Sequence, residues 1–540
     1  MRRLFFLTDI PDKTNKISIF LHKETVNSFD DCVKAKARRN STIHTVKRAI
    51  GLSGRIFIHN PTLKSPEWKT VLEKLTRDTI SISDNSSNKA VVVFKYKQRY
   101  LSLTYGYGKS MLNEDTIERN FGLIVAANLI DPNKIRSLNS MTIEDTIVDT
   151  QKQAVNFSTQ DSFQINQNSE ILKSVSGAPN LETTAKFIVG SDSITATQKM
   201  NIENIKKSIR FYYDTYQKID YVDKGFGWLN NIKRVKDKTK SGLLNSKLEK
   251  DILDEEDNIV VGPNKILDWE DIVGFYITGI GNSKEPDISI SLDYEKYLRC
   301  LRAKPDIKIL DKLKRDKIKA VTDQENHFSI SSVYDGIVYE TTHDNERYLL
   351  CYGDWYKVDE DFFNRIRERV ESAPSCALVF PACNTGDGEG QYNLTVEESN
   401  ENYFSLDKQN YSIPGHGRSK VEPCDILTKD KKFVHVKKGG SSSTLSHLFA
   451  QGLVAARLLS NDVGFRDHVN EKVSSKFGAD LIKFTDKNND FEIVYAIIDH
   501  RAKDLVDTLP FFSLVNLAQT LDQLDAMDYN YSLMKIDVVN

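Results

Sequence analysis

Two predicted strands near the C-terminus constrain the fold of this 540-residue chain more than any other feature. Residues 421–427 form the first strand and carry Asp425, whereas residues 432–438 form the second and carry His435 and Lys437. Because alternate residues of a strand share a face, His435 and Lys437 should point one way and the valines beside them into the core. A short polar turn joins the strands. We therefore expect a hairpin that carries ionisable side chains.

The segment that follows the hairpin is suited to hold an anion. Gly439 and Gly440 permit a tight turn, and the hydroxyl residues after them can cap a helix predicted over residues 444–460. A capped helix N-terminus presents backbone N–H groups and the positive end of the helix dipole to a phosphate. His447 and Gln451 lie four residues apart beside the apolar stripe of this helix, so we expect them to reach the same cleft.

The order of elements in residues 374–540 indicates a known kind of core. A short apolar strand at 377–380 comes first. Periodicity and turn residues then predict a helix, three strands, a helix, a strand, a helix and a strand. They span residues 389–399, 403–406, 421–427, 432–438, 444–460, 491–498, 511–524 and 531–539. This αβββαβ order is typical of metal-dependent nucleases of the PD-(D/E)XK type, whose core is that of restriction endonucleases.

The rest of the chain divides by composition, because 540 residues are too many for a single core. Residues 1–135 predict an N-terminal α+β domain. Residues 136–200 are polar and weakly periodic, which is typical of a connector. Residues 201–373 predict a middle α+β domain, and residues 374–540 predict the nuclease-like domain. The predicted fold class is a multidomain α+β and α/β protein with a PD-(D/E)XK core at its C-terminus.

Charge and cysteine content narrow the functional classes. The 74 basic and 76 acidic residues give a net charge of -2, so any nucleic-acid binding must come from local patches. The six cysteines are scattered without a metal-binding or disulfide pattern, which favours a reducing compartment. The start of the chain lacks the apolar core of a signal peptide, and no stretch approaches the length of a membrane span. We therefore expect a cytoplasmic protein without a membrane partner.

The candidate catalytic residues are Asp425, Glu389, Lys437 and His435. Hydrolysis of a phosphodiester needs oxygen ligands for Mg²⁺ or Mn²⁺ and a positive charge that positions water or stabilises the transition state. We expect Asp425 and Glu389 to hold the metal and Lys437 to supply the charge. Glu422 is a rival acid, but it lies three residues from Asp425 on the predicted strand and should point to the opposite face.

His435 is predicted as a further metal ligand or as a proton acceptor. An imidazole suits Mn²⁺ and other transition metals better than Mg²⁺. Three outcomes therefore stay open: a different metal preference, an acid recruited from elsewhere, or a site that has lost activity. We expect the phosphate backbone of a nucleic acid to be held by a separate set of side chains, namely Lys438, Ser443, His447 and Gln451.

Several short motifs carry a resemblance to a known family along the whole chain. They are Thr-Tyr-Gly-Tyr-Gly (104–108), Asn-Phe-Gly-Leu (120–123), Gly-Phe-Gly-Trp-Leu (225–229), Gly-Gln-Tyr-Asn (390–393), Glu-Pro-Cys-Asp-Ile-Leu (422–427), His-Val-Lys-Lys (435–438) and Leu-Ser-His-Leu-Phe-Ala-Gln-Gly (445–452). On them the chain resembles a sporadically distributed bacterial protein family without an established function, often found near restriction and phage-defence genes. The resemblance implies a PD-(D/E)XK nuclease-like C-terminal domain and, by association, a defence role.

Carried over by position, the resemblance assigns roles to individual residues. Asp425 matches the metal-binding acid of the nuclease pattern, Lys437 the catalytic lysine and Gln451 the helix glutamine of restriction-type relatives. His435 departs from the pattern, which has an acid at that position. The resemblance therefore implies a metal site whose affinity and turnover depend on what replaces that acid.

These observations predict a metal-dependent nuclease that hydrolyses phosphodiester bonds in DNA rather than RNA, in bacterial anti-phage defence. One alternative is a catalytically inactive nucleic-acid-binding or sensing protein that keeps the nuclease fold. Another is a defence effector in which this domain is only a scaffold. A homo-oligomeric state and a phage-derived trigger are left open as partners.

Overall fold

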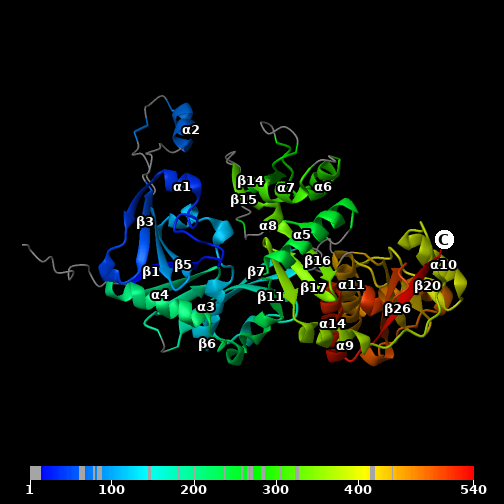
Figure 1. Cartoon of the computed structure of the whole chain (residues 1–540). Coiled ribbons are helices and arrows are strands. Elements are labelled where there is room, and N and C mark those ends of the chain that lie inside the picture. Colours follow the sequence, from blue (N-terminus) through cyan, green and yellow to red (C-terminus); the bar gives the residue numbers. More distant parts are fainter. Residues whose placement is uncertain are drawn as a thin grey trace, which may run out of the picture. The chain divides into compact units, whose positions relative to one another are not determined.

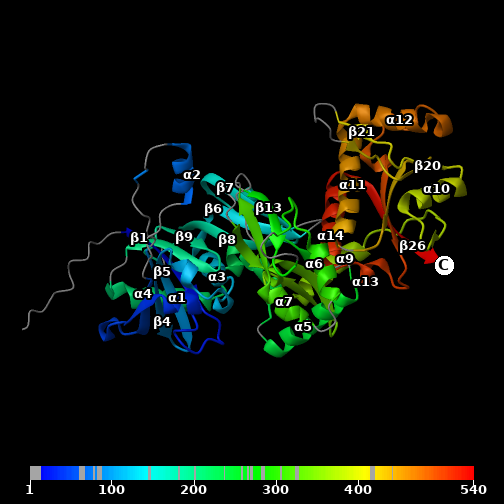
Figure 2. The same cartoon turned by 90° about the horizontal axis from the view of Figure 1, so that it is seen from above.

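The computed structural model describes residues 14–59, 67–76, 80–81, 88–143, 147–180, 183–199, 202–235, 237–256, 259–263, 267, 272–280, 286–303, 307–322, 327–413, 420–440 and 442–539. The chain is a mixed α/β multidomain protein with several sheets, and it divides into two compact units. The first comprises Met1–Met141 and Thr150–Leu229, and the second comprises Thr142–Asp149 and Asn230–Asn540. Figures 1 and 2 show the elements of each unit.

The first unit is built on a ten-stranded sheet with the order β2-β3-β4-β5-β1-β10-β9-β8-β6-β7. Its strands are β1 Thr14–Leu21, β2 Ser41–Thr45, β3 Ser53–His59, β4 Lys89–Tyr96, β5 Arg99–Gly106, β6 Ile130–Ile143, β7 Ile147–Ser158, β8 Glu170–Pro179, β9 Phe187–Gly190 and β10 Ser193–Lys199. Its helices are α1 Ala35–Arg39, α2 Glu67–Leu75, α3 Phe121–Leu129 and α4 Ile202–Tyr216.

Helix α3 lies at the centre of this unit. All but one of its residues are buried, and it packs against β8, β9, β10 and α4. A Cβ on Gly122 would lie 1.9 Å from the carbonyl oxygen of Ser193, and one on Gly190 would lie 2.1 Å from that of Gly122. Only glycine permits this close approach of helix and sheet. The glycine of the Asn-Phe-Gly-Leu motif is therefore a packing residue.

The polar segment at residues 136–200 is not a connector. It forms most of β6 and all of β7 to β10, which complete the ten-stranded sheet. The segment is polar because many strand residues in β6, β8, β9 and β10 are half-buried rather than buried, and the described residues of β7 are half-buried or exposed. Helix α4 likewise belongs to the first unit, because Ile209 and Tyr212 are buried in its core. The middle region thus begins near residue 230 rather than 201.

The middle part of the second unit contains two sheets. One has the order β11-β18-β17-β16-β12 and the other β13-β14-β15. The strands are β11 Ile232–Arg234, β12 Ile259–Val261, β13 Ile272–Ile277, β14 Lys317–Thr322, β15 His327–Ser332, β16 Ile337–His343, β17 Glu346–Cys351 and β18 Asp354–Val358. The helices are α5 Lys238–Leu253, α6 Tyr294–Arg302, α7 Ile309–Arg315, α8 Val333–Gly336 and α9 Glu360–Glu371.

The C-terminal part is a six-stranded sheet with the order β19-β26-β25-β24-β23-β20. Its strands are β19 Cys383–Asn384, β20 Tyr403–Ser405, β23 Ile426–Thr428, β24 Lys432–Lys438, β25 Glu492–Asp499 and β26 Asn530–Val539. The helices are α10 Glu389–Ser399, α11 Ser442–Asn461, α12 Val463–Phe477, α13 Leu505–Thr508 and α14 Phe511–Ala526, and a small pair, β21 Tyr411–Ser412 with β22 Lys420–Val421, is inserted. The helices and strands predicted from residue 389 onward occur in the predicted order, whereas α12 and the short α13 were not predicted.

Helices cover both faces of this sheet. Helix α10 packs on β20, β23 and β24, whereas α11 packs on β24 and β25, and α14 packs on α11 and β26. In both views of the chain the sheet lies between α10 and the α11–α14 pair (Figures 1 and 2). Strand β24 pairs antiparallel with β23 and parallel with β25. Residues 433–436 of β24 are therefore buried between α10 and α11, whereas its two ends are half-buried.

Two predicted strands of this region differ in the structure. Residues 377–380 form no strand. The strand predicted over 421–427 is interrupted, because β22 ends at Val421 and β23 begins only at Ile426. Pro423 lies in the break, and proline has no N–H to donate to a sheet. The interruption leaves residues 422–425 as a loop at the end of the sheet.

Candidate functional site

Asp425 is fixed at the point where this loop enters the sheet. Its backbone N–H donates to the Val434 carbonyl at 3.0 Å, and its carbonyl accepts from the Leu406 N–H at 2.8 Å. Its carboxylate oxygen Oδ2 accepts from the backbone N–H of Val436 at 2.7 Å. The backbone and the side chain of Asp425 are thus both held by neighbouring strands.

The first turns of α10 lie at the C-terminal end of β24, where Val436 binds Asp425. Asn393 donates from Nδ2 to Oδ1 of Asp425 at 3.2 Å and is completely buried. Glu389, the first residue of α10, accepts from the backbone N–H of Lys438 at 3.1 Å. Its other oxygen lies 2.8 Å from Nζ of Lys437. The structure therefore pairs Glu389 of α10 with Lys437 of β24, the same strand whose Val436 N–H binds Asp425.

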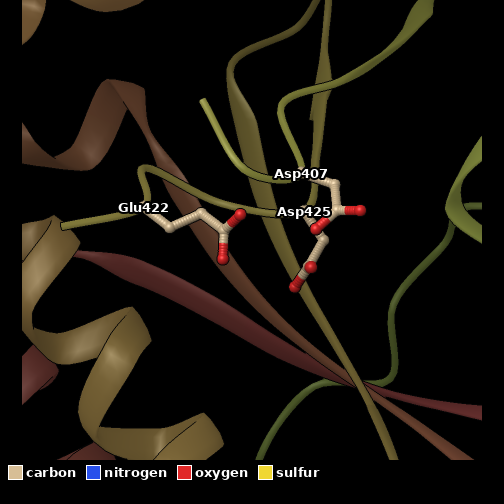
Figure 3. Close-up of side chains that lie close together, drawn as sticks. All are labelled: Asp407, Glu422 and Asp425. Carbon is tan, nitrogen blue, oxygen red and sulfur yellow. The ribbon is translucent and has the colours of Figure 1, made fainter. Parts of the chain in front are cut away.

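Three carboxylates converge at this strand end: Asp407, Glu422 and Asp425 (Figure 3). Asp407 follows β20, and the other two precede β23. One oxygen from each lies within 4.8 Å of the others. Among the described residues, this is the group of acidic, histidine or cysteine side chains close enough to share a metal ion.

The backbone around the carboxylates supports their approach. Oε1 of Glu422 accepts a short hydrogen bond from the backbone N–H of Lys408. A Cβ on Gly390 would lie 2.9 Å from Oδ2 of Asp407, so the glycine leaves room for that carboxylate. Gly390 and Asn393 are the first and last residues of the Gly-Gln-Tyr-Asn motif. The motif therefore shapes the side of the site that α10 supplies.

The site is electrostatically strained. The pKa of Asp425 is raised to about 7, first by burial and then by the nearby Glu422 and Asp407, against the opposing hydrogen bonds from Val436 and Asn393. Burial also raises the pKa of Glu422 above its ordinary value, while Lys437 acts to lower it. The carboxylates are thus costly to ionise together. A bound cation would relieve that cost.

His435 is not brought to these carboxylates. Its side chain is 2% exposed and faces away from the α10 layer, because the adjacent Val434 and Val436 occupy the face that packs with Tyr392 of α10. Its ring lies 6.2 Å from that of Tyr495, which in turn packs against Phe449 of α11. The predicted metal ligand is therefore a core residue between the sheet and α11.

Burial has two consequences for His435. It lowers the pKa of the imidazole to about 3, so the ring is neutral at physiological pH. Its Nε2 atom has no hydrogen-bond partner within the described part of the chain. The pairing register of β24 with β25 is compatible with His435 and Lys437 lying on the same strand face. Only Lys437 reaches Glu389 at the end of the strand, because its side chain is longer.

The predicted phosphate-binding residues occupy different surroundings. The backbone of Lys438 is paired with Glu389, as described above. His447 is exposed and Gln451 is half-buried on α11, and within the described residues neither forms a hydrogen bond with Asp425, Glu389 or Lys437. The side chain of Ser443 lies outside the described part of the structure. Their role in holding a phosphate backbone remains a prediction.

The glycine turn between β24 and α11 opens on a cavity of about 730 Å³ within the second unit. Its lining includes Gly439, Gly440, Arg347, Arg501 and also the acidic Asp499 and Glu340. Asp499 is paired with Arg501 at 2.8 Å, so part of this charge is already neutralised. The carboxylates of the acidic cluster do not line this cavity. The predicted anion-binding turn and the acidic cluster are therefore separate features.

Sequence reasoning missed Asp407 and Asn393 and discounted Glu422. Asp407 lies in a loop and carries no periodic signal. Glu422 was placed on the wrong face because strand alternation was applied across the break at Pro423. The proline was the available signal, since it argues against a continuous strand. Asn393 could have been found from its place in the Gly-Gln-Tyr-Asn motif.

The comparisons with known proteins place the chain in a family. A model described as "Family of unknown function (DUF6119)" matches residues 17–537. The chain belongs to this family. No curated protein and no solved structure matches it. In the described part of the chain, no helix is both long enough and apolar enough to cross a membrane.

Proposed function

We propose that this protein is a metal-dependent nuclease whose C-terminal region is a PD-(D/E)XK-type core. The observation that carries the proposal is the convergence of Asp407, Glu422 and Asp425 beside the Lys437–Glu389 pair at the end of β24. The order and pairing of the elements around β24 support the same core. The role in bacterial anti-phage defence rests on the family resemblance alone, and DNA rather than RNA is kept as the expected substrate.

In the proposed reaction the oxygen of water forms a bond to phosphorus, a phosphorus–oxygen ester bond breaks, and the leaving oxygen gains a proton. A divalent cation, Mg²⁺ or Mn²⁺, supplies positive charge that favours ionisation of water and stabilises the phosphate oxygens. The oxygen-rich donor set of this site fits such a hard cation. Asp425 is the carboxylate most firmly held for that purpose, through its bonds to Val436 and Asn393.

Lys437 is assigned to the substrate side of the site. Its ammonium group, now paired with Glu389, can exchange that partner for a phosphate oxygen or hold the attacking water. We assign Glu389 to positioning Lys437, because both its oxygens are already engaged by Lys437 and Lys438. His435 is left out of the reacting groups, since its buried ring cannot reach them.

A cleavage assay tests the proposal. The full-length protein is incubated with labelled single- and double-stranded DNA and RNA in Mg²⁺ or Mn²⁺. We expect cutting that Asp425→Ala and Lys437→Ala each slow by about 100-fold or more, since each removes a group that acts on the transition state. Lys429→Ala is the matched control, because Lys429 is an exposed lysine on the turn between β23 and β24. Intact substrates under all conditions, or cutting that survives both variants, would contradict the proposal.

The burial of His435 favours a second candidate function. Because β24 carries a buried histidine at position 435 instead of an acid, this strand supplies no acidic ligand there. Such a site is suited to bind nucleic acid without turnover, as a sensing protein would. Binding of labelled DNA without cleavage, unchanged by Asp425→Asn, is the result that would support this candidate over the first.

A further inference from the structure

We infer that one face of the β13-β14-β15 sheet is a binding surface for single-stranded DNA. This outer face is defined by Tyr276 of β13, Lys317 and Lys319 of β14, and His327 of β15. The sheet lies in the middle part of the second unit (Figures 1 and 2). The inference rests on the proposed function and deepens it, because it assigns part of substrate recognition to a region outside the C-terminal core.

The pairing register separates the two faces of this sheet. The inner face packs with side chains of α5, α6 and α7 through Phe275, Ile277, Ile318, Ala320 and Ile330. Tyr276 pairs with Lys319, and Val321 pairs with His327, so these four residues lie on the outer face. Val321 is buried, whereas Tyr276 and Lys319 are half-buried and His327 is exposed. The open part of the outer face therefore consists of a lysine and two rings.

The two rings are held together across β14. The hydroxyl oxygen of Tyr276 lies 3.0 Å from Nδ1 of His327. The ring centroids are 5.5 Å apart in an edge-on arrangement. Unpaired bases stack on aromatic side chains of this kind, whereas the bases of a duplex are already stacked on one another. The outer face is therefore suited to a single strand rather than to a duplex.

Two exposed isoleucines extend the outer face beyond β13. Ser289 is bridged to Phe275, an inner-face residue, so Ile288 and Ile290 on either side of Ser289 fall on the outer face. Their side chains are 43% and 87% exposed. Apolar side chains gathered beside aromatic rings at a surface are typical of a binding site. They add apolar area against which bases and sugars can pack.

The lysines of the outer face supply positive charge that no described acid neutralises. Nζ of Lys319 lies 5.8 Å from the centroid of the Tyr276 ring, and neither Lys319 nor Lys317 forms an ion pair with a described residue. The acid next to the isoleucines, Asp287, is already paired with Lys296 at 2.5 Å. Lysines beside stacking rings complement the phosphates of a nucleic-acid strand. This charge favours a nucleic acid over an apolar peptide as the partner.

Fluorescence anisotropy tests the outer face without depending on cleavage. The full-length protein is titrated into labelled oligo(dT) at low salt in a metal chelator. Tyr276→Ala should weaken binding about 10-fold through the loss of stacking, whereas Tyr276→Phe keeps a ring and should bind as the wild type does. Lys319→Gln should weaken binding a few-fold. It should also reduce the slope of log affinity against log salt by about 0.7, because one phosphate contact is lost.

Matched variants and a duplex serve as controls. Tyr107→Ala and Lys429→Gln change an exposed tyrosine and an exposed lysine on other elements, so both should bind oligo(dT) as the wild type does. Duplex DNA of the same length should be bound equally by the wild type and by Tyr276→Ala, because its bases are not available for stacking. An equal loss of duplex binding in Tyr276→Ala would overturn the inference.

The outcomes separate this inference from the proposed function. Weaker oligo(dT) binding by Tyr276→Ala and Lys319→Gln, with no cleavage by the wild type in Mg²⁺ or Mn²⁺, supports the outer face and overturns the nuclease. Cleavage by the wild type, with oligo(dT) affinity unchanged in both variants, overturns the outer face and leaves the nuclease standing. A wild type that does not bind oligo(dT), or that binds oligo(rU) more tightly, also overturns the inference. Near-ultraviolet circular dichroism checks folding, and Lys319→Gln keeps the test decisive if Tyr276→Ala does not fold.

Discussion

Two clusters of charged side chains, a buried one in the first unit and a half-buried one in the second, contrast in how their charges are balanced. In the first unit, Arg99 and Glu118 are 7% and 6% exposed at the side chain and form an ion pair of 2.8 Å. Arg99 also donates to the carbonyl of His22 at 2.7 Å and 3.0 Å. Both ring nitrogens of His22 are bonded, to Thr116 at 2.9 Å and to Ser102 at 2.7 Å. Each of these buried groups has its partner.

The cluster of the second unit lacks this balance. Asp407, Glu422 and Asp425 gather three acids within 4.8 Å. Nearby, Oδ1 of Asn393 has no partner in the described part of the chain. A complete network of opposite charges holds a fold together, whereas like charges held by the backbone cost stability and bind what neutralises them. The contrast is why we regard the first cluster as structural and the second as functional.

The largest expected effect is on the balanced cluster. Arg99→Met leaves the Glu118 carboxylate buried without its partner, and breaking such a pair costs about 3–5 kcal/mol of stability. Urea denaturation of the purified protein measures the loss. Arg210→Met is the control, because Arg210 is 71% exposed in its pair with Asp214 and should contribute less than about 1 kcal/mol. Equal effects of the two substitutions would remove the distinction between the clusters.

The second effect is a pH dependence that His435 should introduce. Burial holds the folded pKa near 3, below the ordinary 6.5, so the unfolded chain takes up the proton first. Above pH 6.5 the neutral His435 ring does not reduce the free energy of unfolding. As the pH drops from 6.5 toward 3, protonation of this histidine in the unfolded chain progressively lowers that free energy. The loss reaches roughly 2 kcal/mol by about pH 5.

His435→Phe should remove that loss, because the aromatic ring keeps the packing against Tyr495 and does not titrate. We expect urea midpoints of variant and wild type to agree near neutral pH and to diverge below it, with the variant more stable. His22, whose folded pKa burial lowers to about 4, differs because both ring nitrogens are bonded. His22→Phe should therefore destabilise at neutral pH as well. A wild-type curve parallel to that of His435→Phe would show that the ring is not buried as described.

The third effect tests whether the acidic cluster is strained. Without metal, Glu422→Gln removes one like charge and keeps an acceptor for the Lys408 N–H, so it should raise stability by roughly 1 kcal/mol. With Mg²⁺ added, the wild type should gain stability and the variant much less. Thermal unfolding with and without Mg²⁺ measures both changes, with Glu398→Gln as the control. Destabilisation of the metal-free protein by Glu422→Gln would mean that the cluster is balanced after all.

The smallest effect concerns the space that Gly390 leaves for Asp407. Gly390→Ala adds a Cβ 2.9 Å from the Asp407 carboxylate and should weaken Mn²⁺ binding a few-fold by displacing it. Gly388→Ala is the matched control, because a Cβ there meets nothing within 4 Å. Electron paramagnetic resonance titration compares the two variants. Equal Mn²⁺ affinities would indicate that the position of Asp407 is not critical.

Much of the C-terminal core could be predicted from sequence. Helix α10 and strand β24 begin and end at the predicted residues. The ten-stranded sheet was missed in part, because the strands between residues 136 and 200 carry many polar residues at half-buried positions. Composition cannot distinguish such strands from a connector.

The site was less predictable than the core. Alternation along β24 indicates that His435 and Lys437 share a face, but it cannot reveal which face the functional groups occupy when helices cover both. The approach of Asp407 to Glu422 depends on loops that only the folded chain brings together. Pairing of Lys437 with Glu389 likewise joins residues 48 positions apart. These contacts follow from tertiary packing rather than from any local pattern.

The central claim is that the acidic cluster at the end of β24 is a cation site. Anomalous diffraction from crystals of the full-length protein soaked in Mn²⁺ tests it most directly. The account predicts an anomalous peak about 2.0–2.6 Å from carboxylate oxygens of Asp407, Glu422 and Asp425. Fully occupied Mn²⁺ at exposed acids elsewhere, with none at these three residues, would contradict it.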